Sequence, residues 1–405
     1  MVEYISLLAV TSSLLLGQCA LAVQAYEKME FSNVGFSGTY FPVEGMSDID
    51  SLEDCKCERG PKHWFTGVNA PLADYVSVHF RGPLRLSQFA YYSSPSFVVG
   101  DSSSESWTRH AYYDAASQTG ENVTFLTLAG EFSPCLGNAL TYAASNGVDA
   151  ADSSTLLEAD NYISSDEMYS IWSTEPCPAS GIDNGCGYYR EGIPAYYGFG
   201  GVTKMFIFEF QMPPETLANS TSFGYYDLPA IWLLNDHIPR TSQFPNNVNC
   251  SCWASGCGEF DIFEAMNGTQ KNHLYSTFHT FQGIENLQVG IQSYGYIPRD
   301  TVGTMRGGGV FDSDGNVVSF MTNMTSFEDI VDAETVNSWL SSIPQDETYS
   351  TVLESISIAS PTVSATTTAS RRKSKSGGVS SFGQLNGIWF YIFTAVTGLL
   401  QYLVV

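Results

Sequence analysis

The chain has 405 residues, a formal net charge of −25 and a sequence pI near 4.3. Binding of nucleic acid needs clustered Lys and Arg, so this charge argues against nucleic acid as a partner. Only 15% of the residues are charged and 14% are aromatic, which is too apolar for a disordered acidic chain. The composition indicates a globular protein with one large domain or two ordinary ones.

The N-terminus carries an apolar run over residues 5–16, followed by small residues over 20–25. The run is too short to span a bilayer comfortably. We therefore expect residues 1–25 to be a secretory signal peptide rather than a membrane anchor.

The next segment, residues 26–72, contains Cys55 and Cys57 but few long apolar runs. Two interpretations stay open for it. It is either a small cap tied on by disulfides or the first strands of the main domain, which we expect over residues 73–345.

The main domain alternates short β-branched and aromatic segments with clusters of Gly, Pro, Asn and Ser, as an all-β sandwich does. The expected strands are Tyr75–Phe80, Leu84–Tyr91, Val123–Leu128, Lys204–Gln211, Ala230–Leu234, Glu259–Glu264, His273–Thr280 and Val317–Thr322. In the fourth of these, Phe206, Phe208 and Phe210 should share a face, because strand side chains alternate. A partial apolar stripe predicts one helix over Ser326–Leu340.

The strand at residues 258–264 (GEFDIFE) alternates three carboxylates with apolar residues. On a regular strand Glu259 and Asp261 share a face, whereas Glu264 would point the other way. A β-bulge between Asp261 and Glu264 would return Glu264 to the shared side. We predict such a bulge, with Glu259 and Glu264 roughly 5–5.5 Å apart, the separation of retaining glycosidases.

This geometry suggests double-displacement chemistry on a sugar. Glu259 would be the nucleophile, and Glu264 the acid/base, with a pKa raised by the anionic Glu259. Asp261 would orient Glu259 through a hydrogen bond. The alternatives are a solvated sheet face or a calcium site, because carboxylate oxygens bind hard cations. The apolar neighbours favour catalysis, and no metal or other cofactor is expected.

The C-terminus contains a Ser/Thr-rich stretch, a small triplet at Ser376-Gly377-Gly378, a weakly polar spacer and an apolar tail over 388–405. Together these predict a stalk over 346–376 and a GPI-attachment propeptide over 377–405, with Ser376 or Gly377 as the attachment residue. The alternative is a C-terminal transmembrane helix.

Eight cysteines remain after the signal peptide, an even number that suggests four disulfides in a secreted chain. They are Cys55, Cys57, Cys135, Cys177, Cys186, Cys250, Cys252 and Cys257. Sequence does not choose their pairing, and a zinc site at the last three is disfavoured by their spacing. Five N-glycosylation sequons predict exposed loops at Asn122, Asn219, Asn249, Asn267 and Asn323.

Two motifs together resemble the core of family 16 glycoside hydrolases. These are residues 228–234 (LPAIWLL) and the Glu259–Glu264 strand, whose spacing is similar to the bulged, laminarinase-like branch acting on β-1,3-glucans. His279 resembles the histidine on the neighbouring strand of that family. Over about 30–345, including residues 77–84 (SVHFRGPL), the chain is more similar to the fungal "target of SBF"-type cell-wall proteins, which are GPI-anchored and related to glycosyl hydrolases.

The resemblance implies a concanavalin-like β-sandwich (jelly roll) that acts as a retaining endo-β-1,3-glucanase, or transglycosidase, on fungal wall glucan. The two terminal signals predict a location at the cell surface, with a GPI anchor to the membrane, and we expect a monomer. This chain departs from the family in a long insert over 235–257, which we expect to form a disulfide-tied loop over the cleft.

Aromatic side chains could contribute substrate contacts. Trp232 and Trp253 could stack on sugar rings, or pack in the core, and His279 could bind near the acids or be a core histidine. A set of tyrosines could line subsites, although a structural loop is favoured: Tyr188, Tyr189, Tyr196 and Tyr197. The rival functions are a non-catalytic glucan-binding wall protein and a purely structural mannoprotein.

Overall fold

A computed structural model describes residues 24–240 and 247–356. The predicted signal peptide, the attachment residues Ser376 and Gly377 and most of the predicted stalk therefore lie outside the described residues. Within these residues, no helix is both long enough and apolar enough to cross a membrane.

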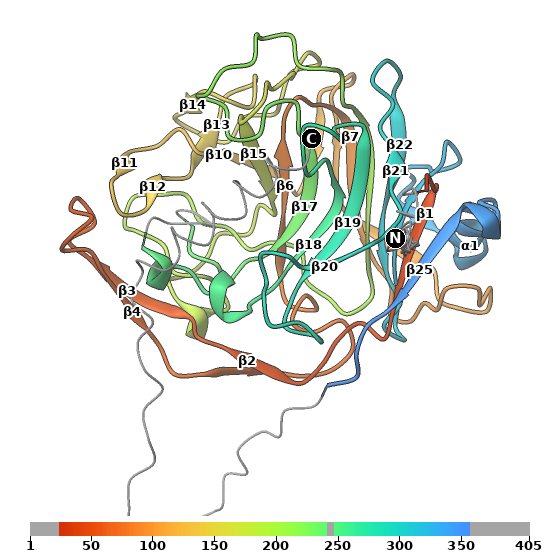
Figure 1. Cartoon of the computed structure of the whole chain (residues 1–405), viewed down its shortest axis with the longest axis horizontal. Helices are drawn as coiled ribbons and strands as arrows, with labels where there is room; N and C mark the ends of the chain where they lie inside the picture. Colours follow the sequence, from red (N-terminus) through yellow and green to blue (C-terminus); the bar gives the residue numbers. More distant parts are fainter. Residues whose placement is uncertain (1–23, 241–246, 357–405) are drawn as a thin grey trace, which may run out of the picture. The chain divides into compact units, whose positions relative to one another are not determined.

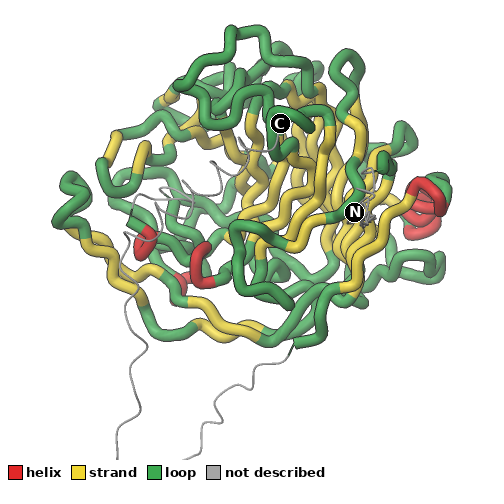
Figure 2. The backbone as a smooth tube through the Cα atoms, in the orientation of Figure 1, coloured by secondary structure: helices red, strands yellow, loops and turns green. Residues whose placement is uncertain are grey.

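Two large, mostly antiparallel sheets form the body of the protein (Figure 1, Figure 2). The first has nine strands, with β9 (Thr119–Glu121) attached to β8. In spatial order, the others are β24 (Ile330–Val331), β8 (Trp107–Asp114), β7 (Arg85–Ser93), β16 (Lys204–Gln211), β22 (Met305–Phe311), β23 (Val317–Met321), β1 (Lys28–Ser32) and β25 (Thr348–Val352). The first and last strands along the chain, β1 and β25, pair in parallel at one edge.

The second sheet has ten strands, with β21 (Ile297–Pro298) attached to β19. In spatial order, the others are β14 (Ala150–Ala151), β13 (Thr141–Ala143), β10 (Thr124–Thr127), β15 (Met168–Trp172), β6 (Val76–Arg81), β17 (Ala230–Asn235), β18 (Glu259–Glu264), β19 (His273–His279) and β20 (Ile291–Gln292). All eight strands expected from the sequence are present within one or two residues of their predicted ends, so the all-β prediction is confirmed.

Phenylalanines from facing strands fill the space between the two sheets. The Phe80 ring of β6 lies 5.9 Å from the Phe208 ring of β16, and Phe210 stacks on Phe263 of β18 at 5.7 Å. Phe206, Phe208 and Phe210 all belong to this core, as their alternation predicts. The protein is thus a sandwich whose core uses the inner face of each sheet.

The outer face of the nine-stranded sheet is covered by α1 (Ala333–Ser341). Val336, Trp339 and Leu340 of the helix pack with Ile207 and other apolar side chains of the sheet. The helix predicted from residue 326 is wrong for its first seven residues. Asp332 caps the helix by accepting a hydrogen bond from the Thr335 N–H, and the preceding residues form β24.

We call residues 33–72, which follow β1, the N-terminal strap. It runs along the bottom of the view in Figure 1, and its Tyr40 and Phe65 belong to the same apolar cluster as Trp232 of β17. It forms two small ladders, in which β2 (Gly38–Tyr40) pairs with β5 (His63–Phe65) and β3 (Val43–Ser47) pairs with β4 (Lys56–Arg59). Strands β1 and β25 lie outside the expected main domain of residues 73–345, yet both belong to the nine-stranded sheet.

Short elements complete the described chain. They are the β11 (Phe132–Ser133) and β12 (Gly137–Asn138) ladder and the 3₁₀ turns Ile182–Asn184, Val248–Cys250, Trp253–Ser255 and Gln345–Glu347.

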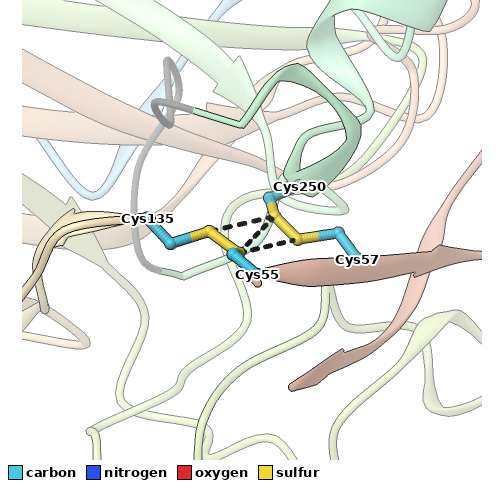
Figure 3. Close-up of side chains that lie close together, drawn as sticks. All are labelled: Cys55, Cys57, Cys135 and Cys250. Carbon is cyan, nitrogen blue, oxygen red and sulfur yellow. Dashed lines mark hydrogen bonds between the residues drawn. A yellow bond between two sulfur atoms is a disulfide. The ribbon is translucent and has the colours of Figure 1, made fainter. Parts of the chain in front are cut away.

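The eight cysteines form four disulfides, which the sequence could count but not pair: Cys55–Cys135, Cys57–Cys250, Cys177–Cys186 and Cys252–Cys257. The first two lie together (Figure 3), with 3.8 Å between the sulfurs of Cys135 and Cys250. They tie the N-terminal strap to the β11 turn and to the insert. The cysteines considered for zinc are all used in disulfides.

All five sequon asparagines are exposed, as their predicted glycosylation would require.

Candidate active site

Strand β18 carries the three acids and contains the predicted bulge. Asp261 pairs with Trp232 of β17 and Thr277 of β19, whereas Glu264 pairs with Ala230 and Tyr275. The partners are two residues apart on their strands, but the acids are three apart, so β18 holds one extra residue. The two residues of the bulge, Ile262 and Phe263, both point inward and lie in the core between the sheets. All three acids therefore point to the outer face of the ten-stranded sheet.

Neighbouring strands add polar and aromatic side chains to the same face. Trp232 pairs with His79 of β6, and the two rings stack with centroids 5.2 Å apart. Ser77 and Arg81 flank His79 on the same face of β6, because they alternate with it. The alternation of polar residues at 77, 79 and 81 was the sequence signal that could have found them.

Glu259 is nearly enclosed, with 6% of its surface exposed. The indole N–H of Trp253 donates a hydrogen bond to Glu259 Oε2. Burial and then the charge of Asp261 raise the pKa of Glu259 well above its usual range, while the positive charge of His279 and the indole hydrogen bond act in the opposite direction. Trp253, for which the sequence leaves sugar stacking and core packing both open, is buried and holds the first carboxylate. Its contact with a sugar stays a prediction.

His279 is placed between two acceptors. Its Nδ1 faces the carbonyl oxygen of Leu287, which can only accept, so Nδ1 carries a proton and donates. Its Nε2 lies 2.9 Å from Asp261 Oδ2. Burial lowers the pKa of His279, but the hydrogen bond and charge of Asp261 and the charge of Glu259 raise it to about 10. At neutral pH, His279 is therefore an imidazolium that donates to Asp261.

Glu264 is paired with a cation that the sequence did not single out. Arg81 Nη2 lies 3.0 Å from Glu264 Oε1, and Arg81 Nε donates to the carbonyl oxygen of Leu228. Burial and then the charge of Asp261 raise the pKa of Glu264 to about 7, although Arg81 lowers it. The pKa of Glu264 is thus raised, as predicted, but the causes are burial and the charge of Asp261 rather than that of Glu259.

A cavity of about 150 Å³ lies beside the acids over β17, β6, β15 and β10. Its lining includes Trp232, His79 and Arg81, the neighbours of Asp261 and Glu264, together with Trp172 of β15. Trp232 therefore lies between the acids and the cavity, where a sugar ring could meet it. Trp172 is a further lining residue that the sequence did not reveal.

The insert covers this cavity, as predicted. Arg240 is buried, with its guanidinium 4.0 Å above the Trp172 ring and an ion pair to Asp236 at 3.3 Å. Ile238 and Pro239 also line the cavity. The insert therefore forms a roof fixed to the floor of the cleft by a cation–π contact.

The tyrosines of residues 188–197 make structural contacts. The Tyr196 hydroxyl bonds to Tyr142, the Tyr197 hydroxyl donates to the Asn184 carbonyl, and the Tyr188 carbonyl accepts from the Arg240 N–H. Their loop, held by Cys177–Cys186, supports the roof. These contacts support the structural interpretation, although Tyr196 also packs against the cavity-lining side chains Leu126, Leu140 and Trp172.

Glu259, Asp261 and His279 offer ligand atoms within 4.8 Å of one another, the arrangement that a metal ion would need. Both nitrogens of His279 are engaged, however, with Nε2 on Asp261 and Nδ1 on Leu287. The three groups are therefore held by hydrogen bonds that would have to rearrange before His279 could bind a metal ion.

The chain is similar to curated fungal proteins over nearly its whole length. It is 61% identical over 379 residues to "Probable circularly permuted 1,3-beta-glucanase YJL171C" of Saccharomyces cerevisiae, covering 93% of each chain. It is 51% identical over 370 residues to "Probable circularly permuted 1,3-beta-glucanase PGA52" of Candida albicans, covering 91% of this chain and 93% of the relative. No solved structure matches the chain.

Two family profiles also match. They are "Cell wall protein YJL171C/Tos1, N-terminal" over residues 27–94 and "Cell wall protein YJL171C/Tos1, C-terminal" over residues 105–339. The resemblance to the "target of SBF"-type wall proteins is thereby confirmed, and the chain belongs to the fungal YJL171C/Tos1 family of cell wall proteins.

Proposed function

We propose that the protein cleaves or transfers β-1,3-glucan of the fungal wall by a retaining mechanism. The observation that carries the proposal is the bulge in β18, which turns Glu259, Asp261 and Glu264 to one face beside a cavity. The 1,3-β-glucanase names of the relatives support the substrate.

In the first step, Glu259 attacks the anomeric carbon and Glu264 donates a proton to the leaving oxygen. A pKa of about 7 leaves Glu264 largely protonated in mildly acidic conditions. Glu259 must attack as an anion. The indole N–H of Trp253 and the positive charge of His279 favour that anion.

In the second step, the glycosyl ester on Glu259 is resolved. Esterification removes one negative charge from the cluster, and Glu264, now deprotonated, takes a proton from the acceptor. Water as acceptor gives hydrolysis, and a glucan hydroxyl gives a new glycosidic bond. Asp261, held by His279, orients Glu259 through both steps.

We also propose the cellular setting. The chain would be secreted by its N-terminal segment, glycosylated at the exposed sequons and held at the plasma membrane by a GPI anchor at Ser376 or Gly377, acting as a monomer. No cofactor takes part in the proposed reaction.

A second function, glucan binding without catalysis, is favoured by one observation. Glu259 and Asp261 are only 6% and 3% exposed, so a substrate carbon reaches them only past other side chains.

The test is incubation of the full-length protein with laminari-oligosaccharides, followed by mass spectrometry and by NMR of the first product. Products that keep the β-configuration, and that disappear in both Glu259→Gln and Glu264→Gln, support the proposal. Saturable binding with no shorter and no longer sugars over days would refute catalysis in favour of binding.

A further inference from the structure

The face that carries the acids is walled on the β19 side. Gly290 lies directly on it, because a Cβ at this position would be 2.4 Å from Thr277 Cγ2 and 2.9 Å from His279 Cε1. His279 Nδ1 donates to the Leu287 carbonyl of the same loop. Thr277, which is paired with Asp261, is fully buried. No sugar can therefore lie over β19 at the level of Asp261.

The Glu259 end of the face is also closed. Trp253 bonds to Glu259 and packs in an apolar cluster with Leu234 and Leu287. Tyr40 and Phe65 of the N-terminal strap belong to the same cluster. The strap and the insert thus seal the surface around the first carboxylate with apolar contacts, and the Cys57–Cys250 disulfide joins the two segments.

The cavity on the opposite side is short. It extends from Trp232 of β17 across β6 and β15 to Leu126 of β10 and to Leu128 and Leu140, of which Leu126 and Leu140 are buried. At about 150 Å³ it is below the range of about 300–1,000 Å³ found for sites that enclose drug-sized ligands. It can receive a short piece of sugar chain and not a long one.

The open end lies at Glu264. The Glu264 side chain is 17% exposed, more than either of the other acids. Arg81, its partner, lies 4.2 Å beneath the ring of Tyr225, which is itself 46% exposed and lines the cavity. Among the residues that line the cavity, only Tyr225 has an exposed side chain, so we place the entrance past Tyr225 and Glu264.

We propose that the site acts on the end of a β-1,3-glucan chain, with the terminal sugar in the cavity and the rest of the chain leaving past Glu264 and Tyr225. The proposal rests on the proposed function and changes its mode, since the family resemblance predicts cleavage within the chain. An internal bond could reach Glu259 only if open groove continued on both sides of it. Here one side is covered by protein, and the cavity on the other side is short and reaches the buried side chains of Leu126 and Leu140.

The experiment uses the full-length protein and laminarihexaose reduced with borohydride, so that mass distinguishes fragments from the two ends. Chain-end action predicts one short product of constant length from the earliest time points, released or transferred. An early mixture of all internal fragment lengths would overturn chain-end action while leaving glucan cleavage intact. Absence of any shortened or lengthened sugar would refute the proposed function, and this inference with it.

A variant tests the pocket directly. Leu128→Trp should fill its far end and lower kcat/KM at least tenfold, mainly through KM. Leu52→Trp is the matched control, because Leu52 is 54% exposed in the N-terminal strap and should leave kcat/KM unchanged. Both variants should melt within a few degrees of the wild type. Unchanged kinetics in a folded Leu128→Trp variant would overturn the proposal.

Discussion

The inner faces of the two sheets pack together in one core, but their outer faces are covered by different segments. Outside the nine-stranded sheet, α1 packs Val336, Trp339 and Leu340 against an apolar surface. Outside the ten-stranded sheet, the strap and the insert cover a surface that contains Glu259, Asp261, Glu264, His279 and Arg81. Both faces are covered, but the strap and the insert enclose three carboxylates, whereas α1 packs on apolar side chains and on Lys28, which donates to the Leu340 carbonyl.

The difference separates stability from function. Enclosing apolar groups stabilises the fold by roughly 25 cal/mol for each Å² removed from water. Enclosing carboxylates costs free energy, which partners offset only in part. The raised pKa values of Glu259 and Glu264 express that cost. Apolar residues at positions 259 and 264 would stabilise this covered face more than buried carboxylates do. The acids therefore indicate a role other than stability.

The largest expected effect comes from removing the nucleophile. Glu259→Gln keeps an acceptor for the Trp253 N–H but cannot form the ester, so kcat should fall at least about a thousandfold. The unfolding free energy should not fall, because a buried carboxyl becomes neutral. Glu209→Gln on the outer face of the nine-stranded sheet, which breaks the ion pair with Arg306, is the control and should keep full activity. Equal activity of the two variants would remove the functional distinction between the sheets.

On the helix-covered face, a substitution should lower stability and leave activity unchanged. Trp339→Ala should lower the unfolding free energy by about 3–5 kcal/mol through the cavity it leaves, measured by urea titration. Activity per folded molecule should stay at the wild-type value below the lowered Tm. Trp339→Phe is the milder control. A change in kcat at full folding would show that the two faces are coupled through the core.

The local parts of this architecture are predictable from sequence. Strand β16 and its phenylalanine face follow from period-two alternation, and the bulge follows from the odd spacing between Asp261 and Glu264. Such patterns reside within one strand, where backbone geometry alone decides which side chains share a face.

The surroundings of the acids are not predictable in this way. Arg81 meets Glu264 across 183 residues, and the wall at Gly290 depends on how a loop folds back. The predicted start of the helix is also wrong, because pairing of β24 with β8 overrides the local apolar stripe. Long-range pairing depends on the topology of the whole sandwich, which local periodicity does not encode.

A smaller effect is expected from Trp253→Phe, which keeps the apolar cover but removes the indole donor. Without the hydrogen bond, the pKa of Glu259 should rise further, because that bond lowers it. The nucleophile then ionises at higher pH, so the acid limb of the kcat/KM profile moves upward. For each pH unit that the limb moves, activity at pH 5 should fall about tenfold. An unmoved acid limb would show that Glu259 does not depend on Trp253.

The smallest effect should appear in the alkaline limb. Glu264 must hold its proton to act as the acid, so kcat/KM should fall above pH about 7, its pKa. The charge of Arg81 lowers that pKa. Arg81→Met removes the charge, so the alkaline limb should move upward by up to about one pH unit, whereas Arg81→Lys, which keeps the charge, should leave it in place. If both variants shift the limb equally, Arg81 acts by shaping the entrance beneath Tyr225; if only Arg81→Met does, the charge on this face sets the proton affinity of the acid.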